Sequence, residues 1–430
     1  MNKEILRLAI PNILSNLSIP LLSTVDTALM GHLSAAHLGA VGVGGMIYNF
    51  IYWNFGFLRM GTTGMTAQAF GKEDQAEMIL TLGRALLVVA GVAALLMLLQ
   101  LPLGKASIFL MNVEGSQSDL VAEYFFVRIW AAPASLAIFA FTGWFFGMQN
   151  AWFPLILTIT VNVINMAFSW FFVRELGWGM SGVAWGTVIA QYAGLLLAVG
   201  LFFSRYRQYL SLLNRKALLA VEALKRFLSV NGDIFIRTVI LTFAFAFFYS
   251  QSADGGELVL GANVVLMQFL NWMSYIVDGF AFAAESVVGK YKGAAHREKL
   301  YRAIRLSFLW GMVMAGLFAL VYGLAGDRLL RIFTEDAEVI KFAKKSLYWM
   351  LILPLVSTPA YMWDGVYIGL TASRAMRNTM FLAIGLYLGV YYSFDYLEIA
   401  DALWWAMTLF LGARGLFQWL LFSRKGIAIT

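Results

Sequence analysis

Residues 20–33 read PLLSTVDTALMGHL, and Asp26 stands in the middle of this otherwise apolar stretch. Asp278 and Glu285 share a second long apolar stretch, and Asp364 lies in a third. An ionisable side chain inside a bilayer is costly, and its default interpretation is a functional group on an ion or substrate pathway. These four acids therefore indicate transport across a membrane.

The composition is that of a polytopic membrane protein. Of the 430 residues, 61% are hydrophobic and only 13% are charged, and the mean hydropathy is +0.75. Soluble domains have about twice this charged fraction. Apolar runs of about 20 residues, enough to cross about 30 Å of hydrocarbon, recur about twelve times. We predict an all-α protein, because a lone helix satisfies its own backbone hydrogen bonds in lipid. The predicted spans are 8–31, 40–62, 79–103, 121–146, 153–174, 181–203, 228–250, 258–286, 304–325, 346–370, 376–394 and 402–423.

The net charge of +7 comes from basic residues that cluster between the predicted spans. The two largest clusters lie within 205–226 and 290–305. With twelve spans, all the basic clusters fall on one side of the membrane, and the positive-inside bias places both termini in the cytoplasm. The excess of positive charge is thus explained by the orientation of the spans in the membrane, and we expect no nucleic-acid partner.

A shift of 222 residues brings similar residues of the two halves into register. The matches are Asn49 with Asn271, Gly71 with Gly293, and Gly147 with Gly369. We predict two six-helix lobes, 1–206 and 228–430, joined by a basic cytoplasmic linker at 207–227. Such repeats are related by a pseudo-two-fold axis along the membrane normal, with a substrate pathway between lobes that rock. The alternative is chance recurrence of Gly and Asn in membrane helices.

Asp26 is preceded in its span by Pro11 and Pro20. A proline removes a backbone donor and clashes with the preceding turn, so both are predicted hinge positions. Burial away from water favours the neutral form of a carboxyl group, which would allow Asp26 to carry a proton.

The span 153–174 offers polar partners for this acid. Asn162, Asn165 and Ser169 are three and four residues apart and share one helical face, and Thr187 follows in the next span. The alternative is that these side chains only form hydrogen bonds between neighbouring helices.

The span 258–286 carries a polar stripe near one helical face. Its members are Asn263, Asn271, Ser274, Asp278 and Glu285. Such a face is not expected to contact lipid.

Two arginines could neutralise the acids of this stripe. Arg59 or Arg237 could pair with Asp278 or Glu285, which would make that acid structural, and Arg237 also stands four residues after Asp233. Asp278, Glu285 and Asp364 remain candidates for cation coupling.

Aromatic residues make up 16% of the chain, and there are 20 Met residues. Rings and thioethers suit varied amphipathic molecules, and a cation gains from ring faces near a carboxylate. The alternative for any one of them is packing or anchoring at the membrane interface. The substrate-binding candidates are Asp26, Met30, Tyr48, Asn49, Met148, Asn162, Asn271, Trp272 and Trp363.

Several segments in both halves together resemble the multidrug and toxic compound extrusion (MATE) family. They are LRLAIPNILSNL, VDTALMGHL, TTGMTAQAFGKED, VNVINMAFSWFFVRELGWGMSGVAWGTVIAQY and YMWDGVYIGLTASRAMRNTM. The pairing of VDGFAFAAE with MWDGVYIGLTAS is more similar to the branch named after the DNA-damage-inducible protein F. The resemblance implies a twelve-helix, two-lobe antiporter of a bacterial inner membrane that exports cationic or amphipathic compounds against inward H⁺ or Na⁺.

The resemblance also implies a cation site. The matching positions are Asp26, Asn165, Ser169 and Thr187. Ser169 replaces a carboxylate of the family pattern, and this loss weakens a Na⁺ site more than a protonation site, so we favour H⁺. Asp364 resembles the C-lobe acid that other branches use for cation binding. No cofactor or metal is implied, and we expect a monomer whose partners are small molecules and membrane lipids.

Other functions are less consistent with the sequence. His32, His37 and His296 lie in or beside predicted loops, no HExxH or GxSxG pattern occurs, and there is no Cys, so an intramembrane enzyme is not expected. A channel is also not expected, because it would need a repeated filter segment and we find none in the sequence. A flippase for lipids or lipid-linked sugars, from a related two-lobed exporter family, remains the alternative.

Overall fold

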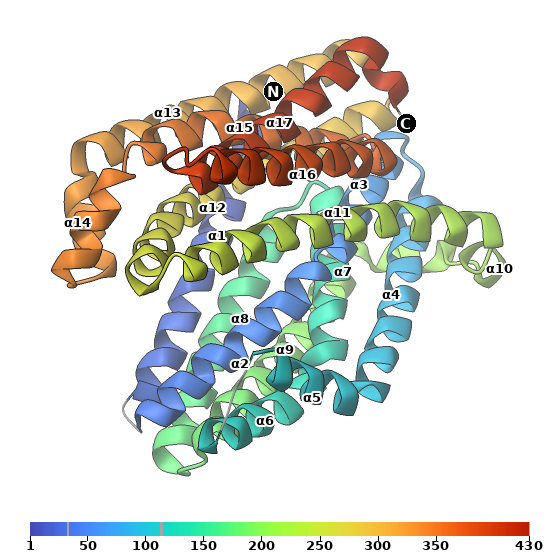
Figure 1. Ribbon diagram of the computed structural model, residues 1–430. Coiled ribbons are helices and arrows are strands. Elements are labelled where there is room, and N and C mark those ends of the chain that lie inside the picture. The colour runs from blue at the N-terminus through green and yellow to red at the C-terminus, as the bar shows by residue number, and fades with distance from the viewer. Residues whose placement is uncertain (32–33, 112–114, 430) are drawn as a thin grey trace. The chain divides into compact units, whose positions relative to one another are not determined.

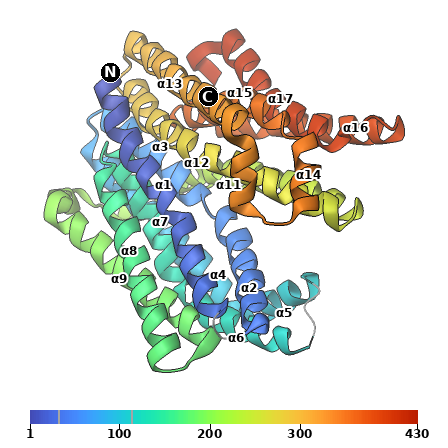
Figure 2. The same cartoon turned by 90° about the vertical axis from the view of Figure 1, so that its left-hand side faces the viewer.

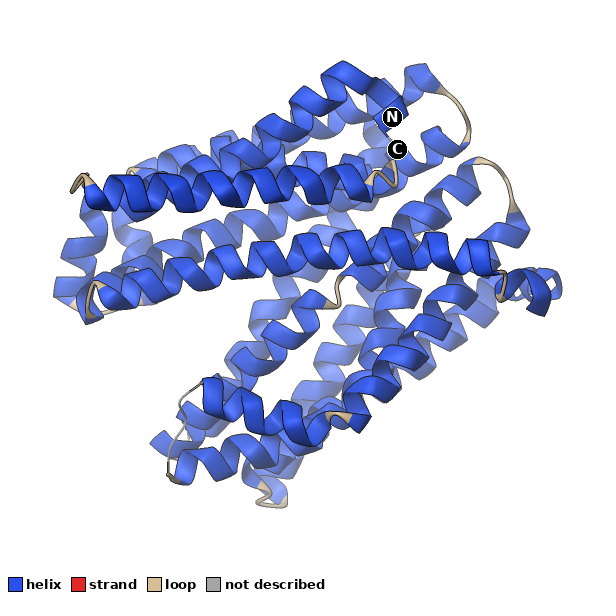
Figure 3. Ribbon diagram, turned by 45° about the vertical axis from the view of Figure 1, so that its right-hand side comes forward, coloured by secondary structure: helices blue, strands red, loops and turns tan. Residues whose placement is uncertain are grey.

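The computed structural model describes residues 1–31, 34–111 and 115–429, so His32 lies outside the described part. All regular elements there are helices, joined mostly by short connections (Figures 1 and 3). The α-helices are α1 (Asn2–Gly31), α2 (Ala35–Asn54), α3 (Phe57–Gly71), α4 (Gln75–Leu98), α5 (Gln100–Leu110), α6 (Ser116–Arg128), α7 (Ala132–Gly147), α8 (Trp152–Trp170), α9 (Gly179–Tyr206), α10 (Arg215–Leu218), α11 (Val221–Asp254), α12 (Glu257–Gly293), α13 (Arg297–Phe333), α14 (Ala337–Lys345), α15 (Trp349–Gly369), α16 (Ser373–Tyr396) and α17 (Ala402–Lys425). The shorter elements are η1 (Ile129–Ala131), the π-helical η2 (Phe171–Glu175), η3 (Arg207–Leu212) and η4 (Gly426–Ile429).

Several of these helices are long and apolar enough to cross a membrane. By length and composition, 8 helical stretches of the described chain meet this criterion, from Gln75–Leu98 to Ala402–Lys425. Some of these stretches combine several consecutive elements. For example, α6, η1 and α7 together form the stretch Gln117–Gly147. These stretches correspond to eight of the twelve spans predicted from the sequence.

The chain divides into two compact units, and both boundaries fall inside helices. One unit is 14–228, and the other comprises 1–13 and 229–430. The first turns of α1 belong to the C-terminal unit, where Lys290 Nζ and Tyr291 Oη lie 2.8 and 2.9 Å from the Glu4 carboxylate. As α1 and α11 each belong partly to both units, they connect the units covalently through continuous helix.

The two halves repeat the same backbone turns. Left-handed residues stand at corresponding helix ends 222 positions apart. Glu73 and Ala295, and also Gln149 and Thr371, follow helices, whereas Gly179 and Asp401 lie at helix starts. Most L-residues avoid this conformation, so three coincidences at one offset indicate a common ancestry of the halves. The offset equals the one predicted from the sequence.

The halves also repeat a close helix crossing. A Cβ atom on Gly143 of α7 would lie under 3.0 Å from the carbonyl oxygen of Arg59 in α3. A Cβ atom on Gly365 of α15 would approach the carbonyl oxygen of Ala281 in α12 equally closely. Both residues of the second pair stand 222 positions after those of the first. In the C-terminal unit α12, α13 and α15 pack against one another around this crossing (Figure 2).

The predicted span 40–62 differs from the structure. Two helices, α2 and α3, replace it, with a break at Phe55 and Gly56, whereas the corresponding α12 continues for 37 residues. Glycine weakens a helix interior, and Asp278 occupies the position that corresponds to Gly56. The predicted linker 207–227 is also largely helical, because η3, α10 and the start of α11 lie there.

An aromatic cluster forms part of the core of the N-terminal unit. Trp144 of α7 is fully buried and donates a hydrogen bond of 2.8 Å to the Met78 carbonyl of α4. Its ring lies 5.4 Å from Phe202 and 4.9 Å from Tyr206 of α9. Buried aromatic pairs of this kind fix the positions of α4, α7 and α9 relative to one another.

Candidate functional site

Asp26 of α1 is an acid with an incompletely bonded carboxyl group. Its Oδ1 atom is buried and forms no hydrogen bond with any described residue. Arg128, at the end of α6, is the charged group that acts on it electrostatically. Burial favours the neutral acid, while Arg128 favours the ionised one.

Arg128 is held by tyrosines and not by a hydrogen-bonded carboxylate. Its guanidinium carbon lies 4.7 Å from the ring centre of Tyr48 and 5.2 Å from that of Tyr124. It also donates a hydrogen bond to the Tyr124 hydroxyl, whereas its buried Nε atom has no hydrogen-bond partner among the described residues. Tyr52 stacks on Tyr48 at 5.6 Å. The arginine therefore occupies aromatic faces that could also hold a cationic ligand.

Short hydrogen bonds connect the first helix to the fifth predicted span. Ser15 Oγ donates to Thr158 Oγ1 at 2.8 Å, and Asn162 Nδ2 donates to Ser18 Oγ at 3.0 Å. These pairs are separated by 143 and 144 positions, so α1 and α8 run parallel there. The same separation places Asp26 at the level of Ser169.

The other predicted members of this site form a network of their own. Asn165 Nδ2 donates to Thr187 Oγ1 at 2.8 Å, and Ser169 Oγ lies 3.5 Å from Asn165 Oδ1. Within the described chain no hydrogen bond links Asp26 to these three residues. The structure therefore groups Asn165, Ser169 and Thr187, and places Asp26 with Arg128.

Asp364 of α15 has very different surroundings from Asp26. Arg237 of α11 and Arg414 of α17 both donate to its Oδ2 atom, the latter at 2.7 Å. Gln418 Nε2 donates to Oδ1 at 2.9 Å. All four side chains are buried. Two arginines and an amide hold this carboxylate ionised, which argues for a structural ion cluster and against an exchangeable cation site.

Asp233 does not form the predicted pair with Arg237 four residues later. It binds Arg377 at 2.6 Å and Ser373 at 3.0 Å, both on α16. Arg237 instead reaches Asp364, because the rotation of α11 directs it towards α15. Arg59, the other arginine considered for the C-lobe acids, lies over the Phe146 ring at 5.9 Å.

The polar stripe of α12 divides into structural and less constrained positions. Asn263 accepts a hydrogen bond from Trp404 at 3.0 Å and donates one to Ser252 at 2.9 Å, so it joins α11, α12 and α17. Ser274 bonds to the Asn271 carbonyl of its own helix at 2.8 Å. These two polar side chains are accounted for by helix packing.

The two acids of the stripe differ in burial. Glu285 is 1% exposed, at the place where Gly369 of α15 approaches the α12 backbone most closely. Asp278 is half-buried and interacts electrostatically with Tyr275 and Tyr361. Both remain predicted coupling residues in the C-terminal unit.

The predicted substrate-binding residues do not form one group. Met30 and Tyr48 lie in one buried cluster, whereas Met148 packs in the Trp144 cluster. Trp363 is buried between the rings of Phe308 and Phe422. Asn49 is exposed, Asn271 is half-buried, and Trp272 is 41% exposed. Met30 and Tyr48 thus belong to the same cluster, and Tyr48 also contacts Arg128.

The predicted hinge prolines lie within continuous helix. Pro11 is buried and Pro20 is half-buried, and α1 runs through both. The boundary between the two units falls two residues after Pro11. Thr24 Oγ1 donates to the Pro20 carbonyl at 2.9 Å. Pro20 has no N–H for the preceding turn, so α1 has a weak point close to Asp26.

Sequence reasoning missed Arg128, Arg414 and Gln418. All three lie inside or at the edge of predicted apolar spans, and the principle that singled out the acids applies equally to intramembrane arginines. The described residues contain no group of three or more His, Cys, Asp or Glu side chains that could hold a metal ion.

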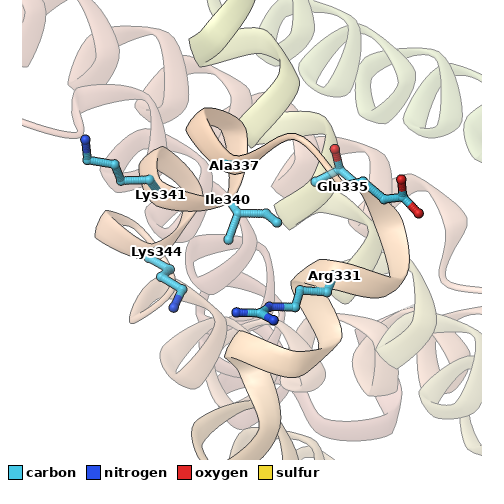
Figure 4. A pocket seen from close by; sticks show the side chains of 7 residues that line it. Arg331, Glu335, Ala337, Ile340, Lys341 and Lys344 are labelled. Carbon is cyan, nitrogen blue, oxygen red and sulfur yellow. The ribbon is translucent and has the colours of Figure 1, made fainter.

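A surface pocket of about 650 Å³ lies where α13 meets α14, apart from all predicted site residues (Figure 4). Figure 4 shows that Arg331 and Lys344 extend towards one another beside Ile340. Lys344 also pairs with Asp327 at 2.6 Å. This pocket is a basic surface feature of the C-terminal unit.

Duplicated halves of membrane-crossing helices with buried ionisable side chains define a two-lobed membrane transporter. The MatE family model matches the chain twice, at residues 11–171 and 234–394, and the chain belongs to this family. The two matches are the two halves. Members of the family are multidrug and toxin extrusion transporters and not enzymes, and they act on small molecules.

Individual relatives agree with this assignment. The chain is 35% identical to the DNA damage-inducible protein F of Escherichia coli over 418 residues, which cover 96% of this chain and 90% of that protein. The crystal structure of MATE in the bent conformation superposes with a TM-score of 0.90 at 18% identity, covering 99% and 95% of the two chains. The outward-facing conformation of a multidrug resistance MATE family transporter of the MOP superfamily has a TM-score of 0.86 at 20% identity, covering 99% and 96%. The predicted family and the predicted fold of twelve transmembrane helices in two six-helix lobes are confirmed.

Proposed function

We propose that this protein is an antiporter that exports cationic or amphipathic compounds in exchange for inward H⁺, with Asp26 as the proton carrier. The observation that carries the proposal is the buried Oδ1 atom of Asp26, which has no hydrogen-bond partner in the described chain. An ionised carboxylate with one oxygen atom lacking a hydrogen bond is less stabilised than a fully bonded one, so it can accept a proton despite the nearby Arg128. We place the protein in a bacterial inner membrane with both termini in the cytoplasm, as the charge distribution favours.

The difference between the lobes supports the N-lobe as the coupling site. At the offset of 222, Phe248, Tyr387 and Tyr391 replace Asp26, Asn165 and Ser169 in the C-terminal half. The buried acid of that half, Asp364, is instead bound by two arginines. Duplicated helices thus carry a polar, exchangeable group in one lobe and an ion cluster in the other.

Arg128 gives the exchange an electrostatic mechanism. While Asp26 is ionised, the two charges balance and a cationic substrate can lie against the aromatic rings nearby. A proton that binds to Asp26 leaves the charge of Arg128 uncompensated. The cation is then repelled, so proton binding and substrate release are coupled without direct contact between them.

We propose that the first helix, α1, is the element that rearranges when Asp26 is protonated. Ser15 and Ser18 connect it to α8, and Pro20 weakens it before Asp26. Loss of the attraction between Asp26 and Arg128 would free the end of α1 from α6. The two lobes would then exchange access between the faces of the membrane, as in other transporters with repeated halves.

The test uses purified protein in liposomes with an imposed pH gradient and a fluorescent cationic drug. We expect coupled drug movement in the wild type and none with Asp26→Asn, because an amide cannot bind and release the proton. Asp119→Asn, at an exposed acid near the start of α6, is the matched control and should transport normally.

A fluorescent lipid probe in the same liposomes tests the flippase alternative. Lipid movement without drug movement would replace the antiporter proposal. Unchanged drug transport by a folded Asp26→Asn variant would remove Asp26 from the mechanism while leaving the transport class intact.

A further inference from the structure

A pocket of about 810 Å³ lies between the ends of α11, α16 and α17 in the C-terminal unit. Its basic lining residues are Arg374, Arg377, Arg424 and Lys425, and its one acid is Asp233. Asp233 is engaged by Arg377 and Ser373. The other three cations form no ion pair within the described chain. The pocket therefore has an excess of positive charge.

The lining changes from basic to apolar along both long helices. On α16 the pocket-lining residues Arg374, Asn378 and Leu382 are four apart and share one face. On α17 the order is reversed, from Phe417 and Leu421 to Arg424. Since the two helices run in opposite directions, both place the charges at the helix ends and the apolar residues deeper in the membrane.

The start of α16 is an unusual place for these charges. A helix N-terminus is the positive end of the helix dipole, so arginine there is unfavourable unless an anion is close by. Arg374 and Arg377 occupy the first turns of α16, and no acidic residue lies in its first turn. Arg424 and Lys425 end α17, where basic residues complement the dipole. Arg377 has Asp233 as its counter-charge, whereas Arg374 has no ion pair within the described chain and needs another explanation.

We propose that this pocket binds the headgroup of an anionic phospholipid from the cytoplasmic leaflet. The phosphate would lie among Arg374, Arg424 and the start of α16, and an acyl chain would follow Leu382 and Leu420, which are 62% and 37% exposed. Basic pockets between membrane helices on the cytoplasmic side suit such headgroups. The proposal depends on the proposed orientation of the chain but not on Asp26 or on the coupling ion.

A free anion is the other source of a phosphate group. It would satisfy the charges but would leave the exposed apolar part of the pocket in contact with other lipids. On both α16 and α17 the lining changes from basic to apolar in the same direction across the membrane. This arrangement is expected only for a ligand that is itself charged at one end and apolar at the other. The pocket at α13 and α14 also has basic lining residues, but it lacks the change from basic to apolar lining along two helices.

The test measures thermal unfolding of the purified chain in detergent with added phosphatidylglycerol, phosphatidylcholine or inorganic phosphate. We expect phosphatidylglycerol alone to raise the unfolding temperature. R374Q/R424Q should bind phosphatidylglycerol on the order of tenfold more weakly, since each basic side chain near an anionic lipid surface contributes measurably to binding. The matched control is R331Q/K341Q, which removes two charges from the pocket at α13 and α14.

Several outcomes would overturn the proposal. Equal stabilisation by inorganic phosphate would make the pocket a free-anion site. Equal stabilisation by phosphatidylcholine, or an equal loss of binding in R331Q/K341Q, would show that the pocket is not selective. If R374Q/R424Q does not fold, the wild type is tested instead by native mass spectrometry in an equimolar mixture of phosphatidylglycerol and phosphatidylcholine. Failure to retain phosphatidylglycerol preferentially would contradict the proposal. Drug transport is not measured, so failure here leaves the antiporter proposal untouched.

Discussion

Asp26 and Asp364 are the same side chain in similar apolar sequence, yet their surroundings give them opposite properties. Asp364 receives hydrogen bonds from two arginines and Gln418. Asp26 has one buried oxygen atom without a hydrogen bond in the described chain, and its cation is shared with tyrosine rings. Both oxygen atoms of the Asp364 carboxylate are hydrogen-bonded and one of Asp26 is not, so Asp364 is suited to structure and Asp26 to exchange.

Replacement of Asp364 should therefore destabilise the protein. Asp364→Asn leaves Arg237 and Arg414 buried beside each other without a counter-charge, which typically costs about 3–5 kcal/mol. We expect a clearly lower unfolding temperature in detergent than for the wild type. Asp26→Asn serves as the comparison and should unfold near the wild-type temperature, because it leaves only Arg128, which its tyrosines hold in place. Equal stability of the two variants would contradict the assignment of Asp364 to a structural cluster.

Arg128 should control how completely a cation is released. A charge about 10 Å from a bound cation contributes about 1–2 kcal/mol at an effective dielectric constant of about 20. Arg128→Gln should therefore bind a cationic fluorescent probe roughly tenfold more tightly at low pH and export it more slowly. Arg128→Lys keeps the charge and should resemble the wild type in equilibrium binding titrations. Identical probe affinity in Arg128→Gln and wild type would exclude the repulsion mechanism.

Among the helices, two pairs are joined by glycines at corresponding positions. Gly143 lets α7 approach α3, and Gly365 lets α15 approach α12. Small residues of this kind allow membrane helices to pack through their backbones. In the C-terminal half the crossing lies directly beside Asp364, so the glycine also fixes the position of the ion cluster.

Filling the crossing of α15 and α12 should cost stability. In Gly365→Ala the new Cβ would collide with the Ala281 carbonyl oxygen, a backbone atom that cannot move without shifting α12. Overpacking typically costs about 1–3 kcal/mol, so we expect a lower unfolding temperature. Gly316→Ala in α13 is the matched control, since nothing lies within 4 Å of its added Cβ. That variant should be neutral or more stable by up to about 1 kcal/mol. A lower unfolding temperature for Gly316→Ala than for Gly365→Ala would contradict this account of the crossing.

The break between α2 and α3 shows where helix prediction from sequence stops. The run 40–62 is predominantly apolar, and hydropathy treats it as one span, although the helix ends at Asn54 and restarts at Phe57. The corresponding α12 is continuous with Asp278 in place of Gly56. Hydropathy measures transfer into lipid, whereas a helix break depends on backbone conformational freedom and on local packing.

For the chain as a whole, the sequence predicted the class, the two halves and the offset between them. Each of these follows from features that can be read along the linear sequence, such as the length of apolar runs and the recurrence of Gly residues. The identity of the partners could not be predicted in the same way. Helical periodicity orders residues around one axis, but the pairing of Asp26 with Arg128, or of Asp364 with Arg414, depends on how separate helices are rotated against one another.

The proposal of H⁺ as the coupling ion rests on what the N-lobe lacks. Ser169 supplies a hydroxyl group where the family pattern has a carboxylate, and it bonds to Asn165 and not to Asp26. Hard cations prefer several charged oxygen ligands, whereas a proton needs only one basic group. One acid next to an arginine is a poor Na⁺ site and an adequate proton site.

We therefore expect a pH gradient and not a Na⁺ gradient to drive export. One pH unit and a tenfold Na⁺ gradient each supply about 1.4 kcal/mol per ion, so the two can be compared at equal driving force. In proteoliposomes, fluorescent-cation transport should follow the pH gradient at constant Na⁺ and should be absent with the Na⁺ gradient at constant pH. The initial rate of fluorescence change measures both, and Asp26→Asn sets the uncoupled baseline. Transport driven by Na⁺ alone, lost in Asp26→Asn, would mean that Asp26 binds a metal cation despite Arg128, and the charge-balance mechanism would then fail.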